Sequence, residues 1–225
     1  MRTMRNVPRC RAGHLFEADY CSACGLSGHN EDYALVDSEV GVCVADGVGG
    51  APLGDAVSRL LCHTVMGALR DGCSAEEALE VGRCRLKSFL RTVDSPRSGA
   101  SVMVLRCDAE NYEVAWLGDV ALFALGKGEQ EPQLITSFDL AGDESSHAVN
   151  VRSNERPMTA FFPKDDICRF ALCTDGVWRD VSSDEIASLL KRDISVREAA
   201  ARLVLRDTVR DDSTAVVVSP RGVEE

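Results

Sequence analysis

The sequence predicts an α+β fold in which antiparallel sheets are covered by pairs of helices. Short apolar runs separated by turn-forming residues indicate strands joined largely by tight connections. Two stretches with apolar residues at helical spacing follow one another from residue 54, and two more follow from residue 182. With 225 residues, of which 45% are hydrophobic, the chain is long enough to bury a substantial core.

The first part of the chain indicates a hairpin followed by a helix pair. The alternating run 33–36 and the apolar run 41–45 flank a short polar turn, which favours a β-hairpin. Apolar residues then recur every three or four positions over 54–69, as in an amphipathic helix. A Ser74-x-x-Glu77 capping box begins a second helix that ends near residue 90, so we expect this pair to cover one sheet.

The second part returns to strands before the second helix pair. Three short strands are expected at 101–106, 112–117 and 120–125, and the polar, aperiodic stretch 137–156 favours a long loop. Another apolar strand at 167–173 ends at an acidic turn. Two helices then begin at Ser182-x-x-Glu185 and Ser195-x-x-Glu198, before a last strand at 214–219.

Composition disfavours several classes of partner. The net charge is −11, from 36 acidic and 25 basic residues, so nucleic acid and anionic membrane surfaces are poor partners. No apolar run approaches the length of a membrane span, and no apolar stretch that would make a secretory signal follows the basic N-terminal residues. Most of the ten cysteines stand singly inside apolar runs, as small core residues do in a reducing compartment. We therefore predict a cytoplasmic protein.

The N-terminal residues have a different character. Two pairs of metal-binding side chains form the pattern C-x3-H-x6-C-x2-C, made by Cys10, His14, Cys21 and Cys24. Four such ligands match a closed, structural zinc site that resembles a truncated zinc ribbon. We therefore expect a zinc-ribbon-like segment over 1–27 and a second domain over 28–225. The alternative is that these cysteines are free thiols.

Carboxylates occupy matching positions at the ends of the predicted strands. Asp46, Asp119 and Asp175 each follow an apolar run, while Asp32 and Asp211 each precede one. In antiparallel sheets the end of one strand lies beside the start of its neighbour, so all five acids can meet at one rim. Because like charges repel in a buried site, such a cluster favours Mg²⁺ or Mn²⁺. Any single acid could instead be a turn or helix-cap residue.

Six short motifs occur in the order and rough spacing of a known family. They are Asn30-Glu31-Asp32, Asp46-Gly47-Val48-Gly49-Gly50, Gly99-Ala100-Ser101, Gly118-Asp119, Thr174-Asp175-Gly176-Val177-Trp178 and Asp211-Asp212-Ser213-Thr214. Together they resemble the metal-dependent serine/threonine protein phosphatases of type 2C, bacterial branch, over residues 28–219. The resemblance implies a four-layer αββα sandwich of two antiparallel sheets flanked by helix pairs.

The resemblance also implies a site and a reaction. Asp46 would bridge two Mg²⁺ or Mn²⁺ ions, the Gly47 carbonyl with Glu31 or Asp32 would serve one ion, and Asp175 with Asp211 the other. Asp119 matches an acid that helps to bind a third, looser ion. A hydroxide between the two metals would hydrolyse phosphoserine or phosphothreonine in proteins, with Asp46, Asp175 and Asp211 as the catalytic residues. A cognate Ser/Thr kinase, a role in signalling and a monomeric enzyme are expected with it.

Two departures from the family pattern concern substrate binding. Ser27 stands where members usually carry a phosphate-binding Arg, so His29 or one of the N-terminal arginines would have to replace it. Val48 stands where eukaryotic relatives often carry a His. These departures leave a second hypothesis open, in which the chain is a weak or inactive phosphatase-like binding module with a zinc-stabilised, partner-binding head.

Overall fold

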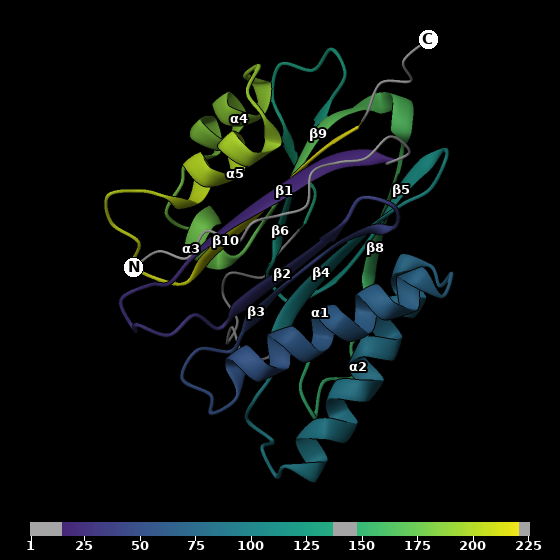
Figure 1. The fold of residues 1–225 in the computed structure, drawn as a ribbon, viewed down its shortest axis with the longest axis vertical. Helices are drawn as coiled ribbons and strands as arrows, with labels where there is room; N and C mark the ends of the chain where they lie inside the picture. The colour runs from purple at the N-terminus through teal and green to yellow at the C-terminus, as the bar shows by residue number, and fades with distance from the viewer. Residues whose placement is uncertain (1–14, 137–147, 221–225) are drawn as a thin grey trace.

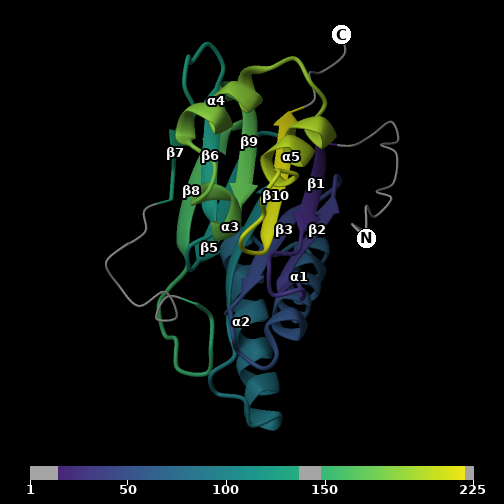
Figure 2. The same cartoon turned by 90° about the vertical axis from the view of Figure 1, so that its left-hand side faces the viewer.

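A computed structural model describes residues 15–136 and 148–220 of the chain. Two five-stranded antiparallel sheets lie face to face, and a pair of helices covers the outer face of each, as Figures 1 and 2 show. The predicted α+β class and four-layer arrangement are therefore confirmed. No helix in the described ranges combines the length and the apolar character needed to cross a membrane.

The first sheet has the strand order β2-β3-β4-β5-β8. Its strands are β2 (Asp32–Asp37), β3 (Gly41–Gly47), β4 (Ala100–Cys107), β5 (Asn111–Leu117) and β8 (Met158–Pro163). Helices α1 (Gly54–Arg70) and α2 (Ala75–Thr92) pack against this sheet and against each other. The hairpin expected at 33–45 is β2 and β3, which pair in register from Asp32 opposite Asp46 to Asp37 opposite Gly41.

The second sheet has the strand order β1-β10-β9-β6-β7. Its strands are β1 (Phe16–Ala23), β10 (Ser213–Pro220), β9 (Ile167–Cys173), β6 (Ala121–Gly126) and β7 (Gln133–Leu134). Helices α4 (Ser183–Lys191) and α5 (Val196–Val204) cover its outer face. A one-turn helix, α3 (Asp175–Trp178), follows β9 directly, and a 3₁₀ turn, η2 (Lys164–Asp166), precedes it.

Three apolar layers hold the sandwich together, because both faces of the inner strands are buried. Val42 and Val44 of β3 face the second sheet, whereas Cys43 and Ala45 face α1 and α2. The layer between the sheets includes fully buried Phe170 and Tyr112, whose rings meet edge to face at 5.1 Å between centroids. A third layer lies between the second sheet and helices α4 and α5.

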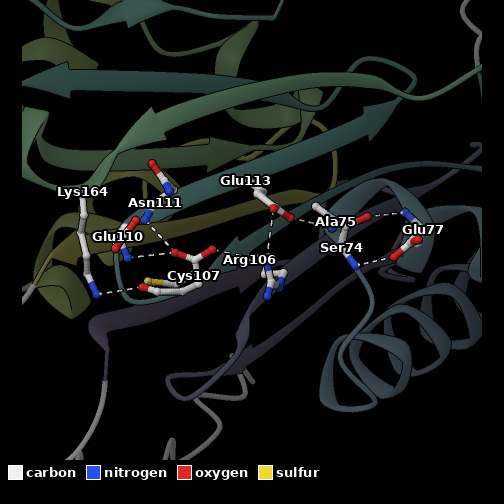
Figure 3. A network of polar contacts seen from close by, with 10 residues as sticks. Ser74, Ala75, Glu77, Arg106, Cys107, Glu110, Asn111, Glu113 and Lys164 are labelled. Carbon is white, nitrogen blue, oxygen red and sulfur yellow. Dashed lines mark hydrogen bonds and ion pairs between the residues drawn. The ribbon is translucent and has the colours of Figure 1, made fainter.

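The helix starts confirm the predicted caps. The Ser74 side chain accepts a hydrogen bond from the Glu77 amide, and the Glu77 carboxylate accepts one from the Ser74 amide. Ser182 and Ser195 accept the corresponding amide hydrogen bonds at the starts of α4 and α5. Figure 3 shows how the start of α2 is tied to the sheet: the Glu113 carboxylate of β5 accepts from the Ala75 amide and pairs with Arg106.

Three strands are not predicted by the sequence, namely β1, β7 and β8. The residues of β1 fall in the segment expected to resemble a zinc ribbon, yet the strand pairs with β10 along its whole length. Phe16 is fully buried between the two sheets. Residues 16–23 therefore form part of the second sheet and gain stability by apolar burial. Of the loop expected at 137–156, residues 137–147 lie outside the described residues.

Candidate active site

The acids predicted to meet at one rim come from both sheets and lie at one end of the layer between them. Asp32 begins β2 and lies opposite Asp46 near the end of β3, while Asp46 in turn lies opposite Ser101 at the start of β4. Asp175 is the first residue of α3, directly after β9, and Asp211 shortly precedes β10. The rim is thus formed by two facing sheets rather than by one.

Asp32 is the most deeply enclosed of these carboxylates. Asp32 belongs to the first sheet, but its Oδ2 accepts a hydrogen bond of 2.8 Å from the hydroxyl of Thr174, which directly follows β9 of the second sheet. Its Oδ1 is buried and has no hydrogen-bond partner in the described part of the chain. Burial above all raises the pKa of Asp32 to about 7; hydrogen bonds from Thr214 and Thr174 lower this pKa, and the charges of Asp212 and Asp175 raise it further.

Asp46 and Asp175 lie in contact across the two sheets. Burial, followed by the charges of Asp32, Asp175 and Asp119, raises the pKa of Asp46 well above its usual value, and its carboxyl shares a hydrogen bond with Asp175. Burial likewise raises the pKa of Asp175 to about 6, although Arg179 acts in the opposite direction. Two carboxyls in such contact need either a shared proton or a cation between them.

Glu31 and Asp211 lie on the more open side of the cluster. Burial, with repulsion from Asp212, Asp55 and Asp211, raises the pKa of Glu31. The Glu31 side chain lies so close to Gly54 that a Cβ there would come within 2.6 Å of it. Gly47 is in similarly tight contact with Gly54, 2.7 Å from a hypothetical Cβ, so the glycines let the end of β3 approach the start of α1.

Asp119 stands beside Ser101 and Arg179. The Ser101 hydroxyl donates to Asp119 Oδ1 at 2.7 Å, and Arg179 Nη2 lies 3.6 Å from Asp119 Oδ2. Arg179 Nη1 also pairs with Asp175 Oδ2 at 2.8 Å. The sequence predicts Asp119 in the cluster but gives no role to Arg179, which the structure places between two of the predicted metal ligands.

Asp212 is a second residue whose role the sequence does not predict. Its two carboxylate oxygens accept hydrogen bonds from the backbone amides of Gly25 and Glu31, at 2.8 and 2.7 Å. Asp211, immediately before it, is exposed and acts electrostatically on Asp175. Adjacent acids before a strand give no periodicity from which to decide which one turns inward, so only the structure separates their roles.

The cluster is suited to divalent cations but is not arranged around one. Across residues 15–136 and 148–220, no three His, Cys, Asp or Glu side chains converge as ligands of a single ion. Asp175 and Asp119 are engaged by Arg179, and Asp32 by Thr174. The unpartnered Asp32 Oδ1 and the contact between Asp46 and Asp175 nevertheless match the oxygen-rich sites that Mg²⁺ and Mn²⁺ favour.

The other predicted ligands are only partly described. Cys10 and His14 lie outside the described residues. Cys21 packs against the apolar layer beneath α5, whereas the Cys24 thiol hydrogen-bonds with Asp212. Slight burial and the Asp212 charge raise the pKa of Cys24, which opposes the thiolate that zinc requires. His29 is exposed near the start of α1, with Nε2 3.8 Å from Asp55 Oδ2.

Comparison with known proteins decides the family. The family model described as Protein phosphatase 2C matches residues 27–210. The chain belongs to the protein phosphatase 2C family. No curated protein matches by sequence, but many solved structures match the fold of this chain.

Three solved structures illustrate the shared fold. The serine/threonine phosphatase PstP/Ppp of Mycobacterium tuberculosis has a TM-score of 0.78 at 21% identity, covering 92% of this chain and 99% of that one. The catalytic domain of PstP in complex with two manganese ions has a TM-score of 0.77 at 22% identity, covering 91% and 97%. The serine/threonine phosphatase Stp1 from Staphylococcus aureus has a TM-score of 0.80 at 14% identity, covering 97% and 100%. At these identities the likeness establishes the fold.

Proposed function

We propose that this phosphatase 2C domain hydrolyses phosphoserine and phosphothreonine in proteins with the help of two Mg²⁺ or Mn²⁺ ions. The observation that carries the proposal is the contact between Asp46 and Asp175. Asp32 and Asp119 are the other charged neighbours of Asp46 in this cluster. A buried group of acids is costly unless cations compensate it. The family and the manganese-bound PstP structure support the same choice of metal.

Two divalent cations bound there would lower the pKa of the attacking water and neutralise the phosphoryl oxygens. Within this chain, Asp46 would serve both ions, and its position between the acids of the two sheets supports this role. Asp175 and Asp211 would complete one site. The Gly47 carbonyl with Asp32 or Glu31 would complete the other. We assign Asp46, Asp175 and Asp211 as the catalytic set.

The residues around the cluster orient these acids rather than react. Thr174 fixes the Asp32 carboxylate, and Asp212 holds the backbone of Gly25 and Glu31 in place. Gly49 and Gly50 are exposed after β3, and no atom lies within 4 Å of a Cβ built at either. This turn leaves room for a protein substrate beside Asp46, and the exposed His29 is our candidate for a contact to the substrate phosphate.

The test is phosphate release from matched phosphoserine, phosphothreonine and phosphotyrosine peptides with Mn²⁺, Mg²⁺ or EDTA. We expect metal-dependent activity on the first two peptides, lost by at least about a hundredfold in Asp46→Asn because the variant removes a charge shared by both ions. Asp165→Asn, an exposed acid in η2, is the matched control and should keep full activity. An inert wild-type protein that still binds two Mn²⁺ ions would instead favour the inactive binding module.

The zinc site is a separate proposal with its own measurement. We propose that Cys10, His14, Cys21 and Cys24 bind one structural Zn²⁺ that stabilises the N-terminal residues. Metal analysis of purified protein should then find about one zinc per chain, reduced in Cys24→Ser. Cys168→Ser changes another exposed cysteine, outside the zinc pattern, and is the control. Zinc well below one per chain in wild type, or no change in Cys24→Ser, would refute the site.

A further inference from the structure

Arg179 is a cationic side chain that lies among the acids of the site. Its guanidinium contacts Asp175 at 2.8 Å and Asp119 at 3.6 Å, one with each of its two terminal nitrogens. It also lies over the Trp178 ring, 5.1 Å from the ring centroid. The Arg179 side chain is 35% exposed, whereas those of Asp175 and Asp119 are 15% and 23% exposed. The positive charge is therefore held partly out of water, between two enclosed carboxylates.

Local structure fixes Arg179 in this place. Thr174 is the residue at which the one-turn helix α3 begins, and the Arg179 amide closes that turn by donating to the Asp175 carbonyl at 2.9 Å. Residues four apart on a helix lie on the same face, so Arg179 is directed back onto Asp175. Trp178 secures the other partner, because its indole Nε1 donates to the Asp119 carbonyl at 2.9 Å. The same turn thus positions the guanidinium against both acids.

We infer that Arg179 is a built-in cation that fills the position between Asp119 and Asp175, where a metal ion would otherwise bind. The Asp119 carboxylate is then compensated by Arg179 and Ser101 and is not available to an exchangeable ion. The inference builds on the proposed metal centre. It limits the site to the ions held by Asp46 and its neighbours, and it replaces the third, looser ion that the sequence implies for Asp119.

The test counts bound ions and does not depend on turnover. The full chain is stripped with chelator and titrated with Mn²⁺, and free Mn²⁺ is measured by electron paramagnetic resonance. Arg179→Met should bind one Mn²⁺ more than wild type, with at least about tenfold higher affinity than any residual wild-type binding at that position. Arg179→Gln is the second neutral variant should Met perturb folding. Arg179→Lys should bind the wild-type number.

Two further variants make the result specific. Adding Asp119→Asn to Arg179→Met should abolish the additional ion, since Asp119 would be its ligand. Arg202→Met removes another arginine paired with an acid four residues away, Glu198 on α5, and should leave the ion count unchanged. Equal counts in wild type and Arg179→Met would overturn the inference, as would an additional ion that persists without the Asp119 charge.

The outcome is distinguishable from failure of the proposed function. If wild type binds no Mn²⁺ and releases no phosphate, the proposed function fails, while a gain of one ion in Arg179→Met still supports a built-in cation. If the ion count is unchanged but inhibition by inorganic phosphate weakens about tenfold in Arg179→Met, the arginine binds the substrate phosphate and the inference is overturned.

Discussion

Replacing Asp32 by Asn should stabilise the metal-free protein at pH 8. Asp32 is 7% exposed, and only one of its carboxylate oxygens has a hydrogen-bond partner among the described residues. Asn keeps the size of the side chain and the oxygen that accepts from Thr174, but it cannot ionise. The variant therefore removes the cost of a buried charge while preserving the contact between the two sheets.

The magnitude follows from the pKa of Asp32, which burial raises from 3.8 to about 7. The folded state holds this proton more tightly than the unfolded state. The contribution of Asp32 protonation to the free energy of unfolding therefore falls as pH rises from about 4, and this contribution is lost above about pH 7. A difference of this size corresponds to roughly 4 kcal/mol at most, since each pKa unit is about 1.36 kcal/mol. For a chain of this length that amounts to a Tm change of roughly 8–16 °C.

The assay is thermal unfolding in EDTA between pH 5 and pH 8. Wild type should lose stability across this range, and Asp32→Asn should lose markedly less, so the variant unfolds at the higher temperature at pH 8. Mn²⁺ should raise the Tm of wild type at pH 8, because cations compensate the ionised acids. A wild-type Tm that stays flat from pH 5 to pH 8 in EDTA, or an Asp32→Asn variant less stable than wild type at pH 8, would refute the reasoning.

Two further predictions concern the scaffold around the site. Gly118→Ala should cost roughly 2–4 kcal/mol in denaturant unfolding, because φ is +92° there and the new Cβ would clash with Ser101; Gly128→Ala, with φ +79° and open space, should cost about 1 kcal/mol. Leu86→Ala should cost roughly 2–5 kcal/mol, because Leu86 is fully buried between α2 and the sheet. Leu134→Ala, 53% exposed in β7, is its control, and equal costs at the two leucines would contradict the described core.

The sequence predicts the buried elements well and the edge strands poorly. Strands β3, β4 and β9 are apolar runs because both of their faces are covered, and capping serines mark three of the helices. In β8 no residue is fully buried; its apolar residues are interrupted by Thr159 and end at Pro163, so they form neither a long apolar run nor a clear alternation. The two-residue β7 is too short to carry any pattern.

In the site, the sequence predicts where the acids lie but not which side chains contact them. That the acids cluster at strand ends follows from topology, and the structure brings Asp32, Asp46, Asp119 and Asp175 into electrostatic contact. The hydrogen-bond partners of these acids depend on side-chain geometry, which cannot be predicted from the spacing of residues in the sequence. Thr174, which follows β9, donates to Asp32, and Asp212 accepts hydrogen bonds from two backbone amides. Asp175 and Arg179 are four residues apart in the sequence, but they form an ion pair because the one-turn helix after β9 brings both side chains to the same face.

Strand β1 connects the N-terminal residues to this site. Ser22 of β1 hydrogen-bonds with Thr214 of β10 at 2.8 Å, and Asn30 donates to the same Ser22 hydroxyl. The Gly25 amide, just beyond the strand, donates to Asp212, whose other oxygen holds Glu31. These hydrogen bonds connect β1 to the segment that carries Glu31 and Asp32. If Zn²⁺ binds Cys21 and Cys24 as proposed, it would brace the strand and turn that align these acids, so zinc loss should lower Mn²⁺ affinity as well as stability.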